Sequence, residues 1–242
     1  MAPKASRVSK RISGKKSQVS KTATSPPPTS TPDLELDSPI YFWRPQEVAT
    51  GYLSQWYAHP FRDRIDKNKI YATAEHYMMH QKALLFGDAE IAATILEATS
   101  PRDVKSLGRA VRGFDQATWE RERERIVTDG NWCKFSLPVL EDIKDGEAGP
   151  RTWKLGNGDA AQTVQASSFR DVLLATGTRE LVEASPYDRI WGVGFAAKGA
   201  ENKRHKWGMN LLGKCLMELR EQFRKEVEAE AEAAGLENGE EP

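Results

Sequence analysis

Every aromatic side chain of the 242-residue sequence lies between Tyr41 and Phe223, and this confinement sets the limits of any folded core. Aromatic side chains supply much of the apolar area that a core buries. The stretch they span is about 180 residues long, which suits one domain of the usual size, roughly 100 to 200 residues. The sequence therefore predicts a single domain over residues 40–223, with a tail on each side.

The two ends of the chain carry opposite charges. Residues 1–32 hold seven Lys and Arg and no acid, whereas residues 226–242 hold seven Glu and no base, so the formal net charge of the chain is zero. Tails of this composition bury too little apolar surface to offset the entropy lost on ordering. We expect residues 1–39 to form a disordered, basic Ser/Pro-rich tail and residues 224–242 to be an acidic continuation of the last helix that frays.

Several protein classes do not fit the sequence. No apolar run approaches the ~18 to 20 residues that a bilayer-spanning helix needs, so we expect no membrane association. Two cysteines, Cys133 and Cys215, cannot make a disulfide-rich scaffold, which favours a reducing compartment, the cytoplasm or the nucleus. The basic run over residues 10–16 fits nuclear import, an organellar transit peptide, nucleic-acid contact or a simple solubilising tail.

Local patterns predict an α+β fold that is predominantly helical. Strands and helices do not alternate as a parallel sheet would require. Short strands are expected between residues 41 and 71, and again over residues 180–185 and 189–193. Polar and Gly-containing residues 141–166 indicate an inserted surface loop. Helices are expected after the capping residues Thr73, Asp88, Ser100, Asp115, Ser168 and Asn210, the third running to about Arg112 and the fourth through Arg125.

The segment from Thr73 to Ala83 has the most informative spacing. Glu75 and Lys82 are seven residues apart, so they share one helix face, separated by a rise of ~10 Å. Neighbouring Tyr77, Met78 and Met79 make the surroundings apolar, and the gap is wide enough for a sugar-sized group. Spacing alone favours the ordinary alternative, a Glu and a Lys on a solvated helix face.

Two other patterns are weaker. His76 and His80 have the spacing of metal ligands on a helix, but Glu75 precedes the first His, whereas in zincins a Glu follows it. We interpret this pair as structural or solvent-facing, and expect no metal and no cofactor. The run of residues 192–194, Gly-Val-Gly, imitates a dinucleotide fingerprint without the repeated strand–helix–strand context, although its loop can still hold an anion.

Six ordered blocks resemble the NADAR or YbiA-like family between about Tyr41 and Arg220. They cover residues 51–57 (Gly-Tyr-Leu-Ser-Gln-Trp-Tyr), 73–82, 108–109, 173–177, 181–194 and 210–217. Two features depart from the family pattern. Gln55 stands where the family usually has Asn, which puts substrate contacts in doubt, and residues 141–166 interrupt a link that is usually more direct. Such an insertion is either a lid or a tolerated loop.

The resemblance implies an N-glycosidase, which cleaves the bond between a ribose anomeric carbon and the nitrogen of a base or amine. Its oxocarbenium-like transition state needs a negative group near the sugar and a nucleophile. We hypothesise that Lys82 attacks C1′ and forms a Schiff base with the opened ribose, while Glu75 stabilises positive charge and moves protons. The remaining implied site residues are Asp188 as a catalytic residue and Ser54, Trp56, Arg109, Trp191 and Gly192 as substrate-binding residues.

These residues have expected roles of their own. Asp188 would accept hydrogen bonds from ribose hydroxyls or assist protonation, Arg109 would bind phosphate, and Trp191 would stack on a base. The ordinary alternatives are a turn-capping acid, a surface Arg and a core Trp. ADP-ribosylated guanine, free or in nucleic acid, is the substrate expected first, because the basic tail suits a polyanion. A small phosphorylated intermediate of riboflavin synthesis is the second, and a noncatalytic ADP-ribose or nucleic-acid binding module is the alternative of another class.

Overall fold

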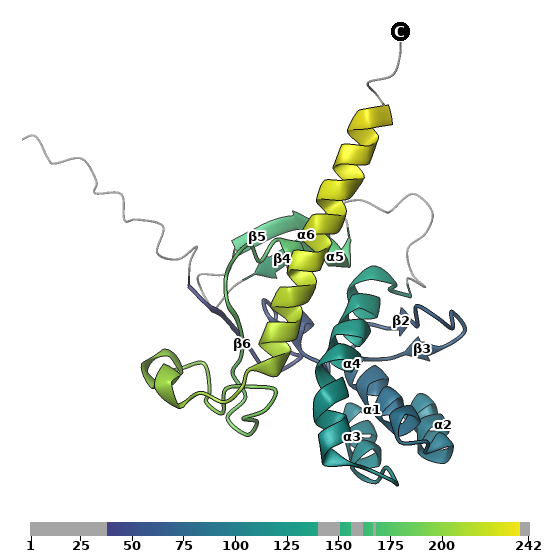
Figure 1. Cartoon of the computed structure of the whole chain (residues 1–242). Helices are drawn as coiled ribbons and strands as arrows, with labels where there is room; N and C mark the ends of the chain where they lie inside the picture. The colour runs from purple at the N-terminus through teal and green to yellow at the C-terminus, as the bar shows by residue number, and fades with distance from the viewer. Residues whose placement is uncertain (1–37, 140–150, 156–161, 167, 238–242) are drawn as a thin grey trace, which may run out of the picture. The chain divides into compact units, whose positions relative to one another are not determined.

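The computed structural model describes residues 38–139, 151–155, 162–166 and 168–237 (Figure 1). The expected disordered tail over residues 1–39 and the end of the acidic tail therefore lie almost wholly outside the described residues. The described residues belong to one compact unit. About half of the described residues are helical and the sheets are small, so the expectation of a predominantly helical α+β domain is confirmed.

Six helices follow the predicted capping residues. They are α1 (Ala74–Leu85), α2 (Ala89–Glu97), α3 (Pro101–Arg109), α4 (Gln116–Ser136), α5 (Phe169–Leu174) and α6 (Leu211–Glu237). The side chains of Thr73, Asp88 and Asp115 each accept a hydrogen bond from the first turn of their helix. Such caps satisfy amide groups that have no partner within the helix. The local sequence thus sets where these helices begin.

Helix α3 ends earlier than predicted, at Arg109 rather than near Arg112. Arg112 leaves the helical path because Asp88 binds both its backbone N–H, at 2.9 Å, and its guanidinium Nη2, at 2.6 Å. Helix α4 continues past Arg125 to Ser136. A tertiary ion pair therefore overrides the helical propensity of the residues after Arg109.

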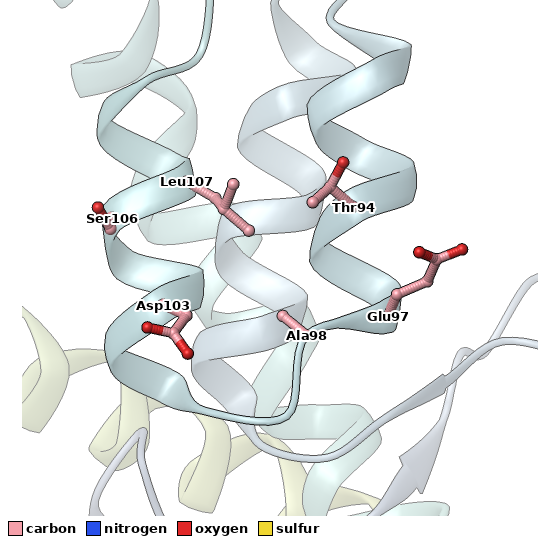
Figure 2. Close-up of a pocket in the computed structure, with 6 residues that line it drawn as sticks. All are labelled: Thr94, Glu97, Ala98, Asp103, Ser106 and Leu107. Carbon is pink, nitrogen blue, oxygen red and sulfur yellow. The ribbon is translucent and has the colours of Figure 1, made fainter.

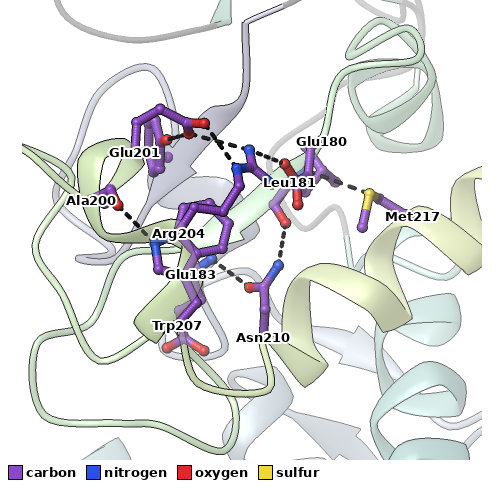
Figure 3. A network of polar contacts seen from close by, with 10 residues as sticks. Glu180, Leu181, Glu183, Ala200, Glu201, Arg204, Trp207, Asn210 and Met217 are labelled. Atoms are coloured by element: carbon purple, nitrogen blue, oxygen red, sulfur yellow. Dashed lines mark hydrogen bonds and ion pairs between the residues drawn. The ribbon is translucent and has the colours of Figure 1, made fainter.

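Asn210 precedes α6 as predicted, but its side chain does not cap that helix. It lies in the left-handed region with φ of 50°, and its side chain amide bridges strand β6 (Leu181–Glu183), as Figure 3 shows. Its Nδ2 donates to Leu181 O at 2.9 Å and its Oδ1 accepts from Glu183 N at 2.9 Å. The first amides of α6 donate instead to the carbonyls of Ile190 and Trp191, both at 3.1 Å.

The strand expected over residues 189–193 is therefore absent from the described chain. Its backbone carbonyls cap α6, and Asp188 Oδ1 accepts from Ile190 N and Trp191 N at 2.8 Å each. A segment whose backbone groups close a turn and a helix end has none left for a strand ladder. The expectation was wrong because alternating apolar residues fit a packed loop as well as a strand.

The described strands pair in three small sheets. Strand β1 (Ile40–Phe42) runs parallel to β6, with Tyr41 opposite Val182, and β2 (Phe61–Arg62) runs antiparallel to β3 (Ile70–Tyr71). Strands β4 (Arg151–Leu155) and β5 (Gln162–Ala166) form an antiparallel hairpin. The expectation of a loop over residues 141–166 is thus wrong for its described part. Trp153 and Val164 pair across the hairpin and pack against the core, and Ala166 is buried, but the flanking polar and Gly-containing residues masked this strand pattern in the sequence.

The core forms where α1 meets three other helices. Helix α1 packs against α2, α3 and α4, while α4 and strand β6 pack against α6. Figure 1 shows α1 between α2 and α3, with α4 running from this group toward α6. Two short 3-10 helices, Gly51–Leu53 and Glu201–Lys206, lie in the connections. No helix in the described part of the chain is long and apolar enough to span a bilayer.

Candidate active site

The first turn of α1 and the segment 51–57 meet through the backbone. The Glu75 amide donates to Gln55 O at 3.0 Å, so the residue before Trp56 lies directly against the start of the helix. Ser54 is buried, and its Oγ accepts from Trp56 N at 3.3 Å, which turns the chain toward α1. Glu75 and Trp56 are thus brought together, as predicted. The Ser54 hydroxyl has a structural partner as well as its expected role toward substrate.

Glu75 is an unusually placed carboxylate. Its side chain belongs to a residue that is only 4 % exposed, and no described residue donates a hydrogen bond to its Oε1. Burial raises the pKa of Glu75 to about 7; Lys105, a hydrogen bond from the Trp56 side chain and Arg109 lower it, and Asp188 raises it. A carboxyl group that titrates near neutrality can accept or release a proton during a reaction.

The loop after β6 brings three further predicted residues to this region. Asp188 acts electrostatically on Glu75, and one of its two carboxylate oxygens closes the turn to Trp191. Trp191 is half-buried and packs against the core. Gly192 allows the close return of this loop, because a Cβ there would lie 2.6 Å from Glu183 O. Asp188 and Trp191 therefore have the turn and core contacts of their ordinary alternatives, and Asp188 also lies close to Glu75.

Lys82 lies on the α3 side of α1, two turns beyond Glu75. Its Nζ donates to Gly108 O at 2.7 Å and lies 4.4 Å from the centre of the Phe114 ring and 5.5 Å from that of Trp119. Burial lowers the pKa of this amine from its ordinary value. Both predicted residues thus face α3, but their immediate partners differ. The carboxylate of Glu75 acts with Lys105 and Arg109, whereas the amine of Lys82 lies in an aromatic corner.

Lys134 holds the loop that carries Trp56. It is completely buried on α4, and its Nζ donates to Tyr52 O at 2.6 Å and to Ser54 O at 3.0 Å. Burial without a carboxylate partner lowers its pKa to about 7. Sequence reasoning missed this residue, although it continues the buried positions Val127, Gly130 and Asn131 at helical spacing.

Three further residues of the region were not predicted as site residues. Lys105 lies four residues before Arg109 on α3, with its Nζ 5.9 Å from the centre of the Trp56 ring. Glu183 ends β6, and Glu75 acts electrostatically on it. Gln55 is buried, and neither polar atom of its side chain has a hydrogen-bond partner among the described residues. The i, i+4 spacing to Arg109 could have indicated Lys105, whereas only the fold places Glu183 beside Glu75.

The two histidines of α1 have structural partners. His76 Nε2 donates to Ala98 O at 3.1 Å and its Nδ1 lies 2.8 Å from Thr73 Oγ1, while His80 Nδ1 lies 3.1 Å from the Tyr71 hydroxyl. Both rings are buried, and burial lowers both pKa values, so both are neutral at pH 7. Within the described residues, no group of three or more His, Cys, Asp or Glu has the arrangement of a metal site.

Two cavities lie away from the predicted site residues. A cavity of about 400 Å³ opens between α2 and α3, where Figure 2 shows Thr94 and Leu107 on facing helices. A larger one, of about 800 Å³, lies beside the β4–β5 hairpin and is lined by Trp132, Trp153 and Phe169 among others. Neither is lined by Glu75 or Lys82. The arrangement around Glu75 is thus defined by buried polar groups rather than by either of these cavities.

The comparisons with known proteins identify the family of the chain. The model of the NADAR domain family matches residues 41–224. An N-glycosidase of Acanthamoeba polyphaga mimivirus is 35 % identical over 195 residues, which cover 78 % of this chain and 98 % of that protein. N-glycosidase YbiA of Escherichia coli is 28 % identical over 173 residues, covering 72 % and 81 % of the two chains. The solved structure of YbiA superposes with a TM-score of 0.55 at 27 % identity, covering 79 % of this chain and 88 % of that one.

The family match spans the whole described domain, and the relatives are similar along most of their own length. Their shared name denotes hydrolysis of a bond to nitrogen at an anomeric carbon. The chain therefore belongs to the NADAR domain family and is an enzyme of the N-glycosidase type.

Proposed function

We propose that this enzyme removes ADP-ribose from ADP-ribosylated guanine through a Schiff base between Lys82 and the opened ribose. The observation that carries the proposal is the buried Glu75 carboxyl, with one unpaired oxygen and a pKa of about 7, beside the cationic side chains of Lys105 and Arg109. A negative group at this place stabilises positive charge that develops on the ribose as the C1′–N bond lengthens.

The cations of α3 suit the diphosphate of ADP-ribose. Lys105 and Arg109 are one turn apart on α3, and both act electrostatically on Glu75. A diphosphate that binds them would hold its ribose near that carboxyl. The ring of Trp56 lies beside Lys105 and suits a nucleobase. A substrate with one phosphate would leave one of these cations without a partner.

Lys82 supplies the nucleophile in this mechanism. At its ordinary pKa, below ~0.1 % of a lysine is neutral at pH 7, so the amine must be made less basic. Its half-buried position lowers the pKa of the amine and so acts in that direction. The neutral amine attacks C1′ and the base leaves with a proton. The ribose then opens to give the Schiff base, which water hydrolyses to ADP-ribose and the free amine.

Hydrolysis and trapping assays test the proposal together. The wild-type protein should release ADP-ribose from an oligonucleotide with ADP-ribosylated guanine, and borohydride should reduce the intermediate to a stable adduct whose mass maps to Lys82. Lys82→Ala should form no adduct, and its kcat should be lower by at least about 10³-fold. Lys225→Ala is the matched control, because Lys225 is exposed on α6.

Each other result would reject a stated part of the proposal. Normal turnover or an unchanged adduct in Lys82→Ala would reject the Schiff base at this residue. If the protein hydrolyses a phosphorylated riboflavin-synthesis intermediate but not ADP-ribosylated guanine, that intermediate would be its substrate instead. Tight binding of ADP-ribose without hydrolysis of either compound would make the domain a binding module.

A further inference from the structure

Glu183 lies at the C-terminal end of β6, and its backbone is fixed on three sides. Its amide donates to Asn210 Oδ1 at 2.9 Å, and its carbonyl accepts from Val193 N at 2.9 Å. The next amide, of Ala184, donates to Phe42 O at 2.8 Å. Figure 3 shows Glu183 and Asn210 joined in this network. A side chain on a backbone held in this way has a defined position.

One oxygen of the Glu183 carboxyl is buried without a partner. This oxygen, Oε2, is inaccessible to solvent, and no described residue hydrogen-bonds to it. The same holds for Glu75 Oε1 and for both polar atoms of the Gln55 side chain. Buried polar groups are normally paired, since an unpaired one costs free energy. Three such groups on β6, α1 and the segment 51–57 indicate a place where a ligand supplies the missing partners.

The charges that face Glu183 come from three elements. Asp188 of the following loop and Glu75 of α1 are acids, and Lys105 of α3 is the base that acts on both Glu75 and Glu183. Burial, followed by Asp188 and Glu75, raises the pKa of Glu183 to about 8, while Lys105 lowers it. Two carboxyl groups that share a site cannot both ionise easily, and one of them keeps a proton.

We infer that Glu183 is the proton donor of the N-glycosidase site, keeping a proton while Glu75 is ionised and passing it to the leaving nitrogen. The inference rests on the proposed function. As the C1′–N bond breaks, its electron pair goes to the base nitrogen, and the proton moves from the Glu183 carboxyl to that nitrogen. Glu183 is left as a carboxylate. It regains a proton from the water molecule that hydrolyses the Schiff base, so the cycle closes.

The pH dependence of kcat/KM tests this role. Wild-type activity should fall as pH rises through about 8, because Glu183 then loses the proton that it donates. Glu183→Gln should lower kcat about 10²-fold or more and remove this alkaline limb, whereas Glu183→Asp should keep the limb with a smaller loss. Glu180→Gln is the matched control, since Glu180 precedes the same strand and pairs with Arg204 at 2.7 Å on the surface.

A merely structural role would give a different result. Glu183→Gln would then lose rate with an unchanged pH profile, and that outcome, like unchanged activity, would overturn the inference. Infrared difference spectra supply a measurement that needs no turnover. The protonated-carboxyl band at pH 7 should be weaker in Glu183→Gln than in the wild-type protein, with the remainder coming from Glu75, whose pKa is about 7. If the wild-type protein shows the stronger band but hydrolyses no riboside, the proposed function fails while the protonated Glu183 carboxyl stands. Bands of equal strength in the two proteins would overturn the inference.

Discussion

The chemistry of this domain begins with ionisable side chains that are buried without an opposite charge at hydrogen-bond distance. Glu75 and Lys134 are buried, and Glu183 buries one carboxylate oxygen. Burial raises the pKa of both acids and lowers that of Lys134, which favours the neutral form of each. Burial of this kind costs stability once the group ionises. Proteins accept such a cost mainly at functional sites, where a proton must move near neutral pH.

Glu75→Gln should show this cost directly. The pKa of Glu75 is about 7 in the folded protein and 4.5 as the ordinary value, so the stability it contributes is complete below about pH 4.5 and is lost as pH rises through 7. Gln keeps the shape and never ionises. At pH 8.5 the variant should therefore unfold at a temperature several degrees higher than wild type, corresponding to about 3 kcal/mol.

Thermal unfolding at pH 4.5 and pH 8.5 gives the check. The gain should shrink strongly at the lower pH, and exposed Glu97→Gln should show no such dependence. A variant with the same unfolding temperature as wild type at both pH values would mean that Glu75 ionises as easily as an exposed acid.

Between elements, the site depends on how closely α3 approaches α1. Gly108 of α3 is buried against Met79 of α1, and a Cβ at Gly108 would lie 2.0 Å from Met79 Sδ. This contact brings Gly108 O to Lys82 and keeps Lys105 and Arg109 beside Glu75. Because Gly108 has no side chain, α3 lies close enough to α1 to set the position of the candidate nucleophile, Lys82, relative to the candidate phosphate-binding cations, Lys105 and Arg109.

Gly108→Ala should destabilise the domain by about 1 to 3 kcal/mol, because the added methyl group overpacks the α1–α3 contact. It should also lower kcat by moving Gly108 O away from Lys82. Met79→Ala makes room for that methyl group, so the double variant should recover much of the lost activity. Chemical denaturation and steady-state kinetics of the two single variants and the double variant would measure the coupling. Additive effects would show that the two residues do not press on each other.

At the scale of the whole molecule, the first strand and the last helix of the domain both pack against β6. Strand β1 begins at residue 40 and pairs with β6 at residues 181–183, while α6 packs against β6 and α4. The acidic residues near the chain end continue α6 as far as Glu237, as the sequence predicted. Arg170 of α5 pairs with Glu226 and Glu230 of this part of the helix, at 3.4 and 3.5 Å.

Removal of residues 1–37 tests the part that the basic tail has in substrate binding. Seven positive charges should make binding of a nucleic-acid substrate strongly salt-dependent. For single-stranded nucleic acid, the tail should contribute up to about five units to the slope of the logarithm of the binding constant against the logarithm of the salt concentration. The truncated protein should have a higher KM for an ADP-ribosylated oligonucleotide at low salt and a flatter salt dependence. Its kcat on ADP-ribosylated guanosine should be unchanged. Loss of activity on that small substrate would assign the tail a role in the site itself.

The sequence by itself determined the beginnings of the helices and the limits of the domain. Thr73, Asp88 and Asp115 cap helices through contacts within four residues, and local contacts of this kind can be read from spacing. The shared face of Glu75 and Lys82 follows from the same helical geometry. Family resemblance added the candidate roles of Asp188, Arg109 and Trp191.

Only the tertiary structure decided which acids and bases meet. Glu183 reaches Glu75 because β6 pairs with β1 and is bridged by Asn210, and Lys105 reaches both because Gly108 lets α3 approach α1. These contacts join residues up to about 140 positions apart, as in the pairing of Ile40 with Leu181, and no local periodicity encodes them. The pKa of a carboxyl depends on burial and on charges brought near by packing, so the chemistry of the site was settled by the fold.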